Sequence, residues 1–141
     1  MTYKLVIPGA PVGKERARIS PYCVYTPAKT KNYETLVQEL FLSAHGFPML
    51  NGEISAHIKA FYGLNKADYG KYGLSARGRK KLSGEIRPTK KPDADNIAKI
   101  LLDSLNSIAY KDDSQVVRLV VEKHYSEQPR VELEIAKLED I

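Results

Sequence analysis

The spacing of apolar residues switches between helical and strand-like along this 141-residue chain, and the order of these switches most limits its possible folds. Residues 30–44 and 95–108 repeat apolar side chains at helical spacing, so each predicts an amphipathic helix. Shorter segments are strand-like, because their apolar residues alternate or form brief runs. These segments are residues 3–8, 22–25, 53–62, 116–125 and 130–136. The order ββαβ–loop–αββ predicts an α+β domain, with a single mixed sheet of about five strands and the two main helices packed on one face.

The ends of these elements give more specific expectations. Thr30 is a plausible N-cap for the first helix, and Gly46 lies where a glycine is favoured after a helix. The last two strands are expected to form an antiparallel hairpin that turns at residues 126–129. Cys23 is expected to be a small core residue. His57 is expected to face solvent or lie at an edge, and not to be a ligand.

Length and composition indicate one globular domain over residues 1–141. The apolar share of 43% and the charged share of 28% are ordinary for a folded domain. A lone cysteine excludes an intramolecular disulfide and indicates a reducing compartment. No apolar run approaches the roughly 20 residues that a membrane span needs, and no signal peptide is evident. We therefore expect a cytoplasmic protein with no membrane partner.

Basic residues are gathered in two stretches, within a net charge of +5. Such clusters suit a polyanion, because each phosphate contact releases condensed counterions. The alternative is that charge only keeps these loops soluble. The candidate DNA-binding residues are Lys14, Arg16, Arg18, Arg77, Arg79, Lys80, Lys81, Arg87, Lys90 and Lys91.

The segment of residues 63–92 has no clean period, and a structureless stretch of this length is usually functional or mobile. Ser75 could cap a helical turn or two that reaches Leu82. Tyr69 and Tyr72 lie among basic residues, where they could stack on nucleic acid. The alternative is that both tyrosines pack on the domain.

Acidic residues frame the second predicted helix. Asp93 and Asp95 lie where it begins, and Asp95 is followed by Lys99 and Asp103 at successive four-residue steps. The Asp112–Asp113 pair stands immediately before a strand. An ordinary explanation exists for each part, since aspartates favour helix N-termini and turns.

A sharper explanation treats these residues as one site. Clustered carboxylates repel one another unless a cation holds them, and oxygen ligands suit Mg²⁺. Such a metal can activate water and neutralise charge during phosphodiester cleavage. Lys99, one turn from Asp95, could stabilise the transition state or the leaving oxygen. Acidic chemistry beside basic loops is typical of nucleases.

At these residues the sequence resembles the RusA family of crossover junction endodeoxyribonucleases. The resemblance rests on Arg87-Pro88, Lys91-Pro92-Asp93-Ala94-Asp95-Asn96, Lys99, Leu102-Asp103-Ser104-Leu105 and Tyr110-Lys111-Asp112-Asp113-Ser114-Gln115-Val116. Features near the N-terminus, among them Pro8-Gly9-Ala10-Pro11 and Arg16-Ala17-Arg18, extend it over nearly the whole chain.

The resemblance implies a homodimer that binds four-way (Holliday) junctions and nicks two strands symmetrically, in DNA recombination and repair. It implies Mg²⁺ or Mn²⁺ as the cofactor, no nucleotide cofactor, and often a prophage origin. The implied catalytic residues are Asp93, Asp95, Lys99 and Asp113, and the three aspartates among them are the implied metal ligands. Two alternatives remain: a junction-binding accessory protein without cleavage, and a metal-dependent nuclease for other branched DNA.

The length of the second helix raises a question about Asp113. A helix over residues 95–108 is about 20 Å long, with Asp93 at one end and Asp113 beyond the other. Either the chain runs back along the helix, or a partner subunit supplies Asp113 to a composite site. A two-fold dimer with antiparallel second helices would achieve the latter.

Overall fold

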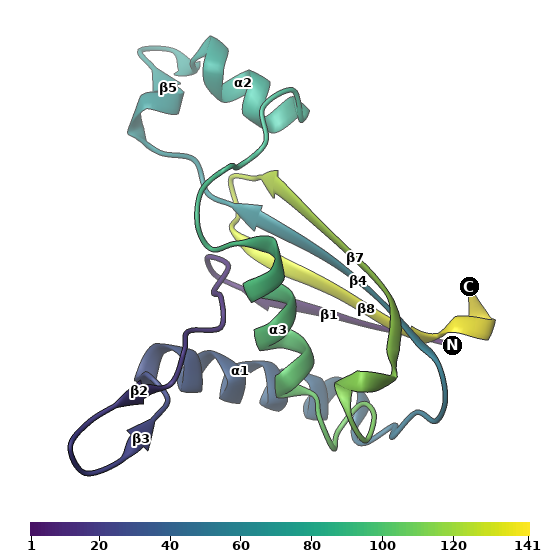
Figure 1. Ribbon diagram of the computed structural model, residues 1–141. Coiled ribbons are helices and arrows are strands. Elements are labelled where there is room, and N and C mark those ends of the chain that lie inside the picture. Colours follow the sequence, from purple (N-terminus) through teal and green to yellow (C-terminus); the bar gives the residue numbers. More distant parts are fainter.

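The computed structural model describes residues 1–141 and contains one principal sheet, with the two longer helices on one face and the shortest helix beyond the end of the strands (Figure 1). The sheet strands are β1 (Thr2–Pro8), β4 (Ile54–Tyr62), β7 (Val116–Tyr125) and β8 (Arg130–Lys137), in the order β1-β8-β4-β7. The helices are α1 (Ala28–His45), α2 (Ala76–Ser83) and α3 (Ala94–Ser104). Short ribbons pair β2 (Arg18–Ile19) with β3 (Val24–Tyr25), and β5 (Tyr69–Gly70) with β6 (Gly73–Leu74). The 3₁₀ turns are η1 (Lys66–Asp68), η2 (Asp113–Gln115) and η3 (Leu138–Asp140). The α+β class and the mixed sheet are confirmed.

The predicted hairpin of the last two strands is wrong, because β4 lies between β7 and β8. Within β4, Ile58 has Val121 as its parallel partner on β7 and Leu133 as its antiparallel partner on β8. The connection at residues 126–129 therefore crosses the end of β4, where the Ser126 amide donates to the Tyr62 carbonyl at 2.9 Å. Alternation shows that a strand is half-buried, but it does not reveal which strand lies next to it. The most buried strand takes the centre.

The core lies between the sheet and the pair α1 and α3. The predicted inner side of β4 is confirmed, since Ile54, Ala56, Ile58, Ala60 and Tyr62 are all buried. Helix α1 contributes buried Tyr33, Val37 and Phe41, and α3 contributes Ile97, Ile100 and Leu101. No helix is long and apolar enough to cross a membrane.

The ends of both helices differ from the sequence-based expectation. Helix α1 begins at Ala28, after Pro27, and Thr30 is a buried residue inside it with no partner for its hydroxyl. Proline's fixed φ favours the start of a helix. Gly46 is confirmed as the C-cap, with φ 67°. Helix α3 ends at Ser104 instead of residue 108, because Ser107 has a left-handed φ of 65° that a continuing helix does not allow. The Tyr110 hydroxyl then donates to the Leu102 carbonyl at 2.7 Å.

The prediction that Cys23 belongs to the core is also wrong. Cys23 is exposed, in the turn of the β2–β3 ribbon. The Ser20 hydroxyl organises this turn, accepting the Cys23 amide proton at 3.1 Å. In Figure 1 the ribbon extends away from the sheet. Neither of its faces packs on the core, so its alternating pattern does not indicate a buried residue.

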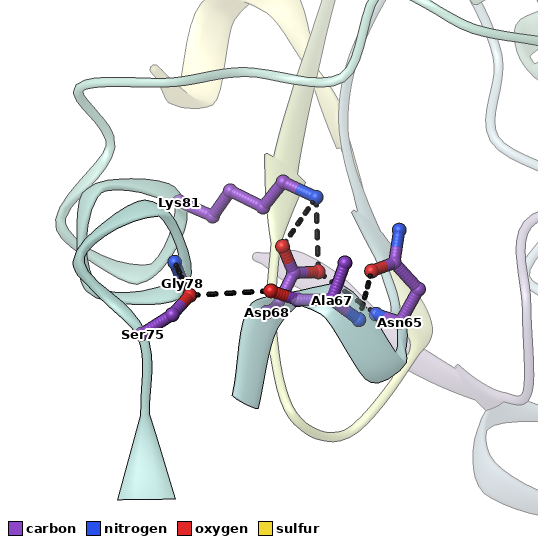
Figure 2. Close-up of polar contacts among 6 residues, drawn as sticks. All are labelled: Asn65, Ala67, Asp68, Ser75, Gly78 and Lys81. Carbon is purple, nitrogen blue, oxygen red and sulfur yellow. Dashed lines mark hydrogen bonds and ion pairs between the residues drawn. The ribbon is translucent and has the colours of Figure 1, made fainter. Parts of the chain in front are cut away.

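Residues 63–91 form a folded unit, with the predicted Ser75 cap confirmed. The Gly78 amide donates to the Ser75 hydroxyl at 3.1 Å, which starts α2 (Figure 2). Gly78 is required here, because a Cβ on it would lie 2.2 Å from the Asp68 carbonyl oxygen. Helix α2 therefore packs directly on the turn that precedes β5.

An internal ion pair holds this unit together. Figure 2 shows the Lys81 ammonium over Asp68, with Nζ 2.9 Å from each carboxylate oxygen. The Lys81 side chain is 5% exposed and the Asp68 side chain 0%. The Asn65 amide also donates to Asp68, and these contacts lower the pKa of Asp68. Lys81 is thus occupied inside the unit and is not available to a phosphate.

Candidate active site

Asp93 and Asp95 lie at the beginning of α3, and both are exposed. Asp93 occupies the N-cap position, yet its side chain makes no capping hydrogen bond. The Asp93 side chain therefore does not cap the helix, although aspartate is common at this position. Its carboxylate remains available to a ligand.

Several contacts hold the segment before Asp93 against the sheet. The Tyr62 hydroxyl, at the end of β4, donates to the Pro92 carbonyl at 2.5 Å. Lys123, near the end of β7, donates to the Lys90 carbonyl at 2.7 Å. Burial, followed by the charge of Asp93, raises the pKa of Tyr62 to about 12. The beginning of α3 thus sits at the carboxyl ends of two parallel strands.

The loop of residues 11–15 forms the other wall. The Lys14 amide donates to the Asn96 carbonyl at 2.9 Å, and a Cβ on Gly13 would lie 2.9 Å from Pro92. A hollow of about 450 Å³ opens between this loop and Asp93, and Lys29 and Lys91 also line it. An acidic group therefore faces cations across a concave surface.

A second acidic group lies at the other end of α3. The Lys14 ammonium is 2.8 Å from Glu34 and 3.6 Å from Asp103. The Asp113 amide donates to the Asn106 side chain at 2.8 Å, which draws the start of η2 against the helix. Of these residues, Lys14 was predicted as a DNA contact, but it is engaged by two carboxylates.

Asp113 is held close to Asp103. Partial burial raises the pKa of Asp113, and the adjacent Asp103 carboxyl raises it further. Sequence reasoning placed Asp103 two four-residue steps after Asp95 but left it out of the site. Its spacing from Lys99 and Asp95 was the signal that could have included it.

The two acidic groups are separated along the helix. From Asp95 to Asp103 the helix rises about 12 Å, with exposed Lys99 midway. Within the chain, no three acidic, histidine or cysteine side chains are gathered closely enough to hold a metal ion. Asp113 is brought to Asp103, and not to Asp93 and Asp95.

The remaining candidate DNA contacts are exposed, in segments that precede α3 in the chain. Arg16 and Arg18 lead into the β2–β3 ribbon, and the others lie on α2 or between α2 and α3. Tyr72 is 93% exposed and Tyr69 is 46% exposed, so neither is packed into the core. The exposed basic residues of the second group are Arg77, Arg79, Lys80, Arg87, Lys90 and Lys91.

Carboxylates and a lysine along one helix, with basic segments on several sides, form the class of site that suits a phosphodiester substrate. Comparison with known families agrees: the model of endodeoxyribonuclease RusA matches residues 8–136. This chain belongs to the RusA endodeoxyribonuclease family. It is also 36% identical, over 142 residues, to the uncharacterized protein YqaN of Bacillus subtilis (strain 168), with 96% of each chain covered.

Proposed function

We propose that this protein is a Mg²⁺-dependent endonuclease that binds four-way DNA junctions as a homodimer and resolves them by paired symmetric nicks. Mn²⁺ would replace Mg²⁺, and the role would lie in cytoplasmic DNA recombination and repair. One observation carries the proposal: α3 presents Asp93, Asp95 and Lys99 on an exposed surface, in a family of endodeoxyribonucleases.

The donor set suits a hard divalent cation. Its groups are carboxylates without sulfur or imidazole, and oxygen ligands are those that Mg²⁺ prefers. Burial and the neighbouring Asp103 carboxyl raise the pKa of Asp113. A bound cation would relieve the repulsion between the two carboxylates. Asp93 and Asp95 would hold the metal together with Asp113, which a single chain leaves at the other end of α3 and which would therefore have to come from the partner subunit of the proposed homodimer. The metal would supply water activation and charge neutralisation.

Basic side chains of the chain would neutralise the carboxylates, assist cleavage and bind the DNA backbone. Lys14 is positioned by Glu34 and Asp103, so it neutralises the carboxylate next to Asp113. Lys99 is exposed and free of ion pairs, so its ammonium can approach a phosphate oxygen or the leaving oxygen. The exposed arginines and lysines around α3 would grip the DNA backbone without reading sequence.

Cleavage of a labelled four-way junction tests the proposal. The wild-type protein with Mg²⁺ is expected to make paired symmetric nicks and to spare linear duplex, and Asp95→Asn is expected to abolish them. Binding without cutting in either Mg²⁺ or Mn²⁺ would support a junction-binding accessory protein instead. Equal cutting of flaps or other branched DNA would favour a broader nuclease.

Lys80 and Lys81 are neighbours on α2 with opposite expected effects. Lys80→Met removes an exposed charge, so junction binding should weaken and its salt dependence should fall by about 0.9 per lost phosphate contact. Lys81→Met leaves Asp68 buried without its partner, so residues 63–91 should become several-fold more sensitive to protease.

The two variants serve as controls for each other. Salt titration of junction binding and limited proteolysis should be measured on both. Protease sensitivity in Lys80→Met as great as in Lys81→Met would contradict the structural role of the ion pair. Unchanged binding by Lys80→Met at every salt concentration would remove this face of α2 from the DNA contacts.

A further inference from the structure

The β2–β3 ribbon carries apolar side chains that nothing in the chain covers. Tyr22, in its turn, is 95% exposed, and Ile19 and Val24 are 83% and 66% exposed. Ile19 and Val24 are cross-strand partners, so their side chains lie on the same face of the ribbon. Single apolar side chains are ordinary on a protein surface, but three at the end of one projecting element are typical of an interaction site.

The turn of the ribbon holds Tyr22 in a fixed place. The Tyr22 and Cys23 amides donate to the Ser20 hydroxyl at 3.2 and 3.1 Å, and the Ser20 amide donates to the Cys23 carbonyl at 2.8 Å. Pro21 fixes the backbone φ immediately before Tyr22. The Tyr22 ring makes none of the aromatic or cation–π contacts found elsewhere in the chain. A ligand that stacks on this ring therefore meets a backbone that has little freedom left to lose.

The charge around the ribbon suits a polyanion. Glu15 is the one acidic residue of residues 14–31, and it is 3.6 Å from Arg18, whose side chain remains 64% exposed. Arg16 is exposed and forms no ion pair. The basic residues of this stretch are Lys14, Arg16, Arg18, Lys29 and Lys31. Such an excess favours a phosphate backbone as the partner, because phosphate contacts release counterions.

The base of the ribbon is joined to the candidate active site. Before the ribbon, the Lys14 amide donates to the Asn96 carbonyl in α3 at 2.9 Å. After it, Lys29 at the beginning of α1 lines the same hollow as Asp93. Figure 1 shows the ribbon projecting beyond the beginning of α1. A nucleic acid with a phosphate in the hollow can therefore also contact the ribbon.

We propose that the β2–β3 ribbon recognises the branch point of branched DNA, with the Tyr22 ring stacked on a base where the arms diverge and the Ile19–Val24 pair against the neighbouring nucleotide. In linear duplex every base is stacked on both sides, so an inserted ring must first unstack a base step, which costs free energy. At a branch point the stack is interrupted, and this cost is smaller. The ribbon then favours branched over linear DNA. The inference rests on the proposed function for its substrate class, but it requires no cleavage.

Binding measured in EDTA, where no metal is present, separates this inference from cleavage. Tyr22→Ala should weaken binding to a four-way junction about tenfold, as expected for one lost base–aromatic stacking contact, and should leave binding to linear duplex unchanged. Tyr22→Phe keeps the ring and should keep the preference. Arg16→Ala is the charge control: it should weaken binding to both DNAs and lower the salt dependence by about 0.9. Circular dichroism verifies that each variant is folded. Equal weakening for junction and duplex in Tyr22→Ala, or no weakening for either, would overturn the proposal.

Photochemical crosslinking tests the contact itself. A junction with 5-iodouracil beside the branch point should crosslink to residue 22 of the wild type and of Tyr22→Phe, but not of Tyr22→Ala, as peptide mass spectrometry would show. The same base placed in the middle of an arm should not crosslink to residue 22. Equal crosslinking from both places, or none to residue 22, would contradict the stacking. Junction preference that depends on Tyr22, without cleavage by the wild type in Mg²⁺ or Mn²⁺, would refute the proposed function but not this inference. Junction cleavage by the wild type, with the full binding preference retained in Tyr22→Ala, would do the reverse.

Discussion

Asp113→Asn is expected to lower metal-dependent junction cleavage roughly a thousandfold, about 4 kcal/mol of transition-state stabilisation. The same substitution is expected to make the folded protein more stable. Both effects have one cause, because the protein holds the Asp113 carboxylate where it is partly buried and close to Asp103. The arrangement costs stability, and in the proposed function it would prepare a cation site.

The pH dependence of the stability effect follows from the raised pKa. Below the pKa that Asp113 has in the unfolded chain, both states are protonated and the residue contributes nothing. Above its folded pKa, the carboxylate is ionised in both states and penalises the folded one. The stabilisation by Asp113→Asn should therefore be full above the folded pKa of Asp113 and vanish in acid, as thermal unfolding at several pH values would show.

The adjacent Asp112 is the matched control. Its carboxylate accepts the Ser114 amide at 3.0 Å, and these contacts with Ser114 lower the pKa of Asp112. Asp112→Asn retains an acceptor for the cap, so cleavage should persist and stability should not rise. Equal loss of cleavage in both variants, or a lower melting temperature for Asp113→Asn at neutral pH, would contradict the assignment.

Tyr110→Ala is expected to lower the free energy of unfolding by about 3–5 kcal/mol, a large part of the 5–15 kcal/mol typical of a domain. Tyr110 is among the largest fully buried side chains, and its removal leaves a cavity next to α3. It also removes the hydroxyl that pairs with the Leu102 carbonyl. Denaturant unfolding measures the loss.

Tyr110→Phe separates the two contributions. The ring stays and only the hydroxyl is lost, and the Leu102 carbonyl still accepts the Leu105 amide, so the expected cost is about 0.5–1.5 kcal/mol for one lost hydrogen bond. A cost for Tyr110→Phe equal to that for Tyr110→Ala would show that packing at this position contributes little. Because Tyr110 precedes the Asp112–Asp113 pair by two residues, Tyr110→Ala should also weaken cleavage.

The sequence by itself determined the elements of the site. Its periods located both main helices and the inner side of β4, since burial of one face repeats at the period of the element. The Asp93, Asp95 and Lys99 spacing was evident for the same reason. The caps at Ser75 and Gly46 were also predictable, because they depend on contacts between residues close in sequence.

Only the tertiary structure decided which elements meet. The position of β4 between β7 and β8, the burial of Lys81 against Asp68, and the approach of Asp113 to Asp103 join distant parts of the chain. The local pattern of apolar and polar residues indicates how deeply a residue is buried, but it does not show which residue it packs against. Lys81 and Lys80 are the same residue type one position apart, and only the fold separates an internal ion pair from an exposed cation.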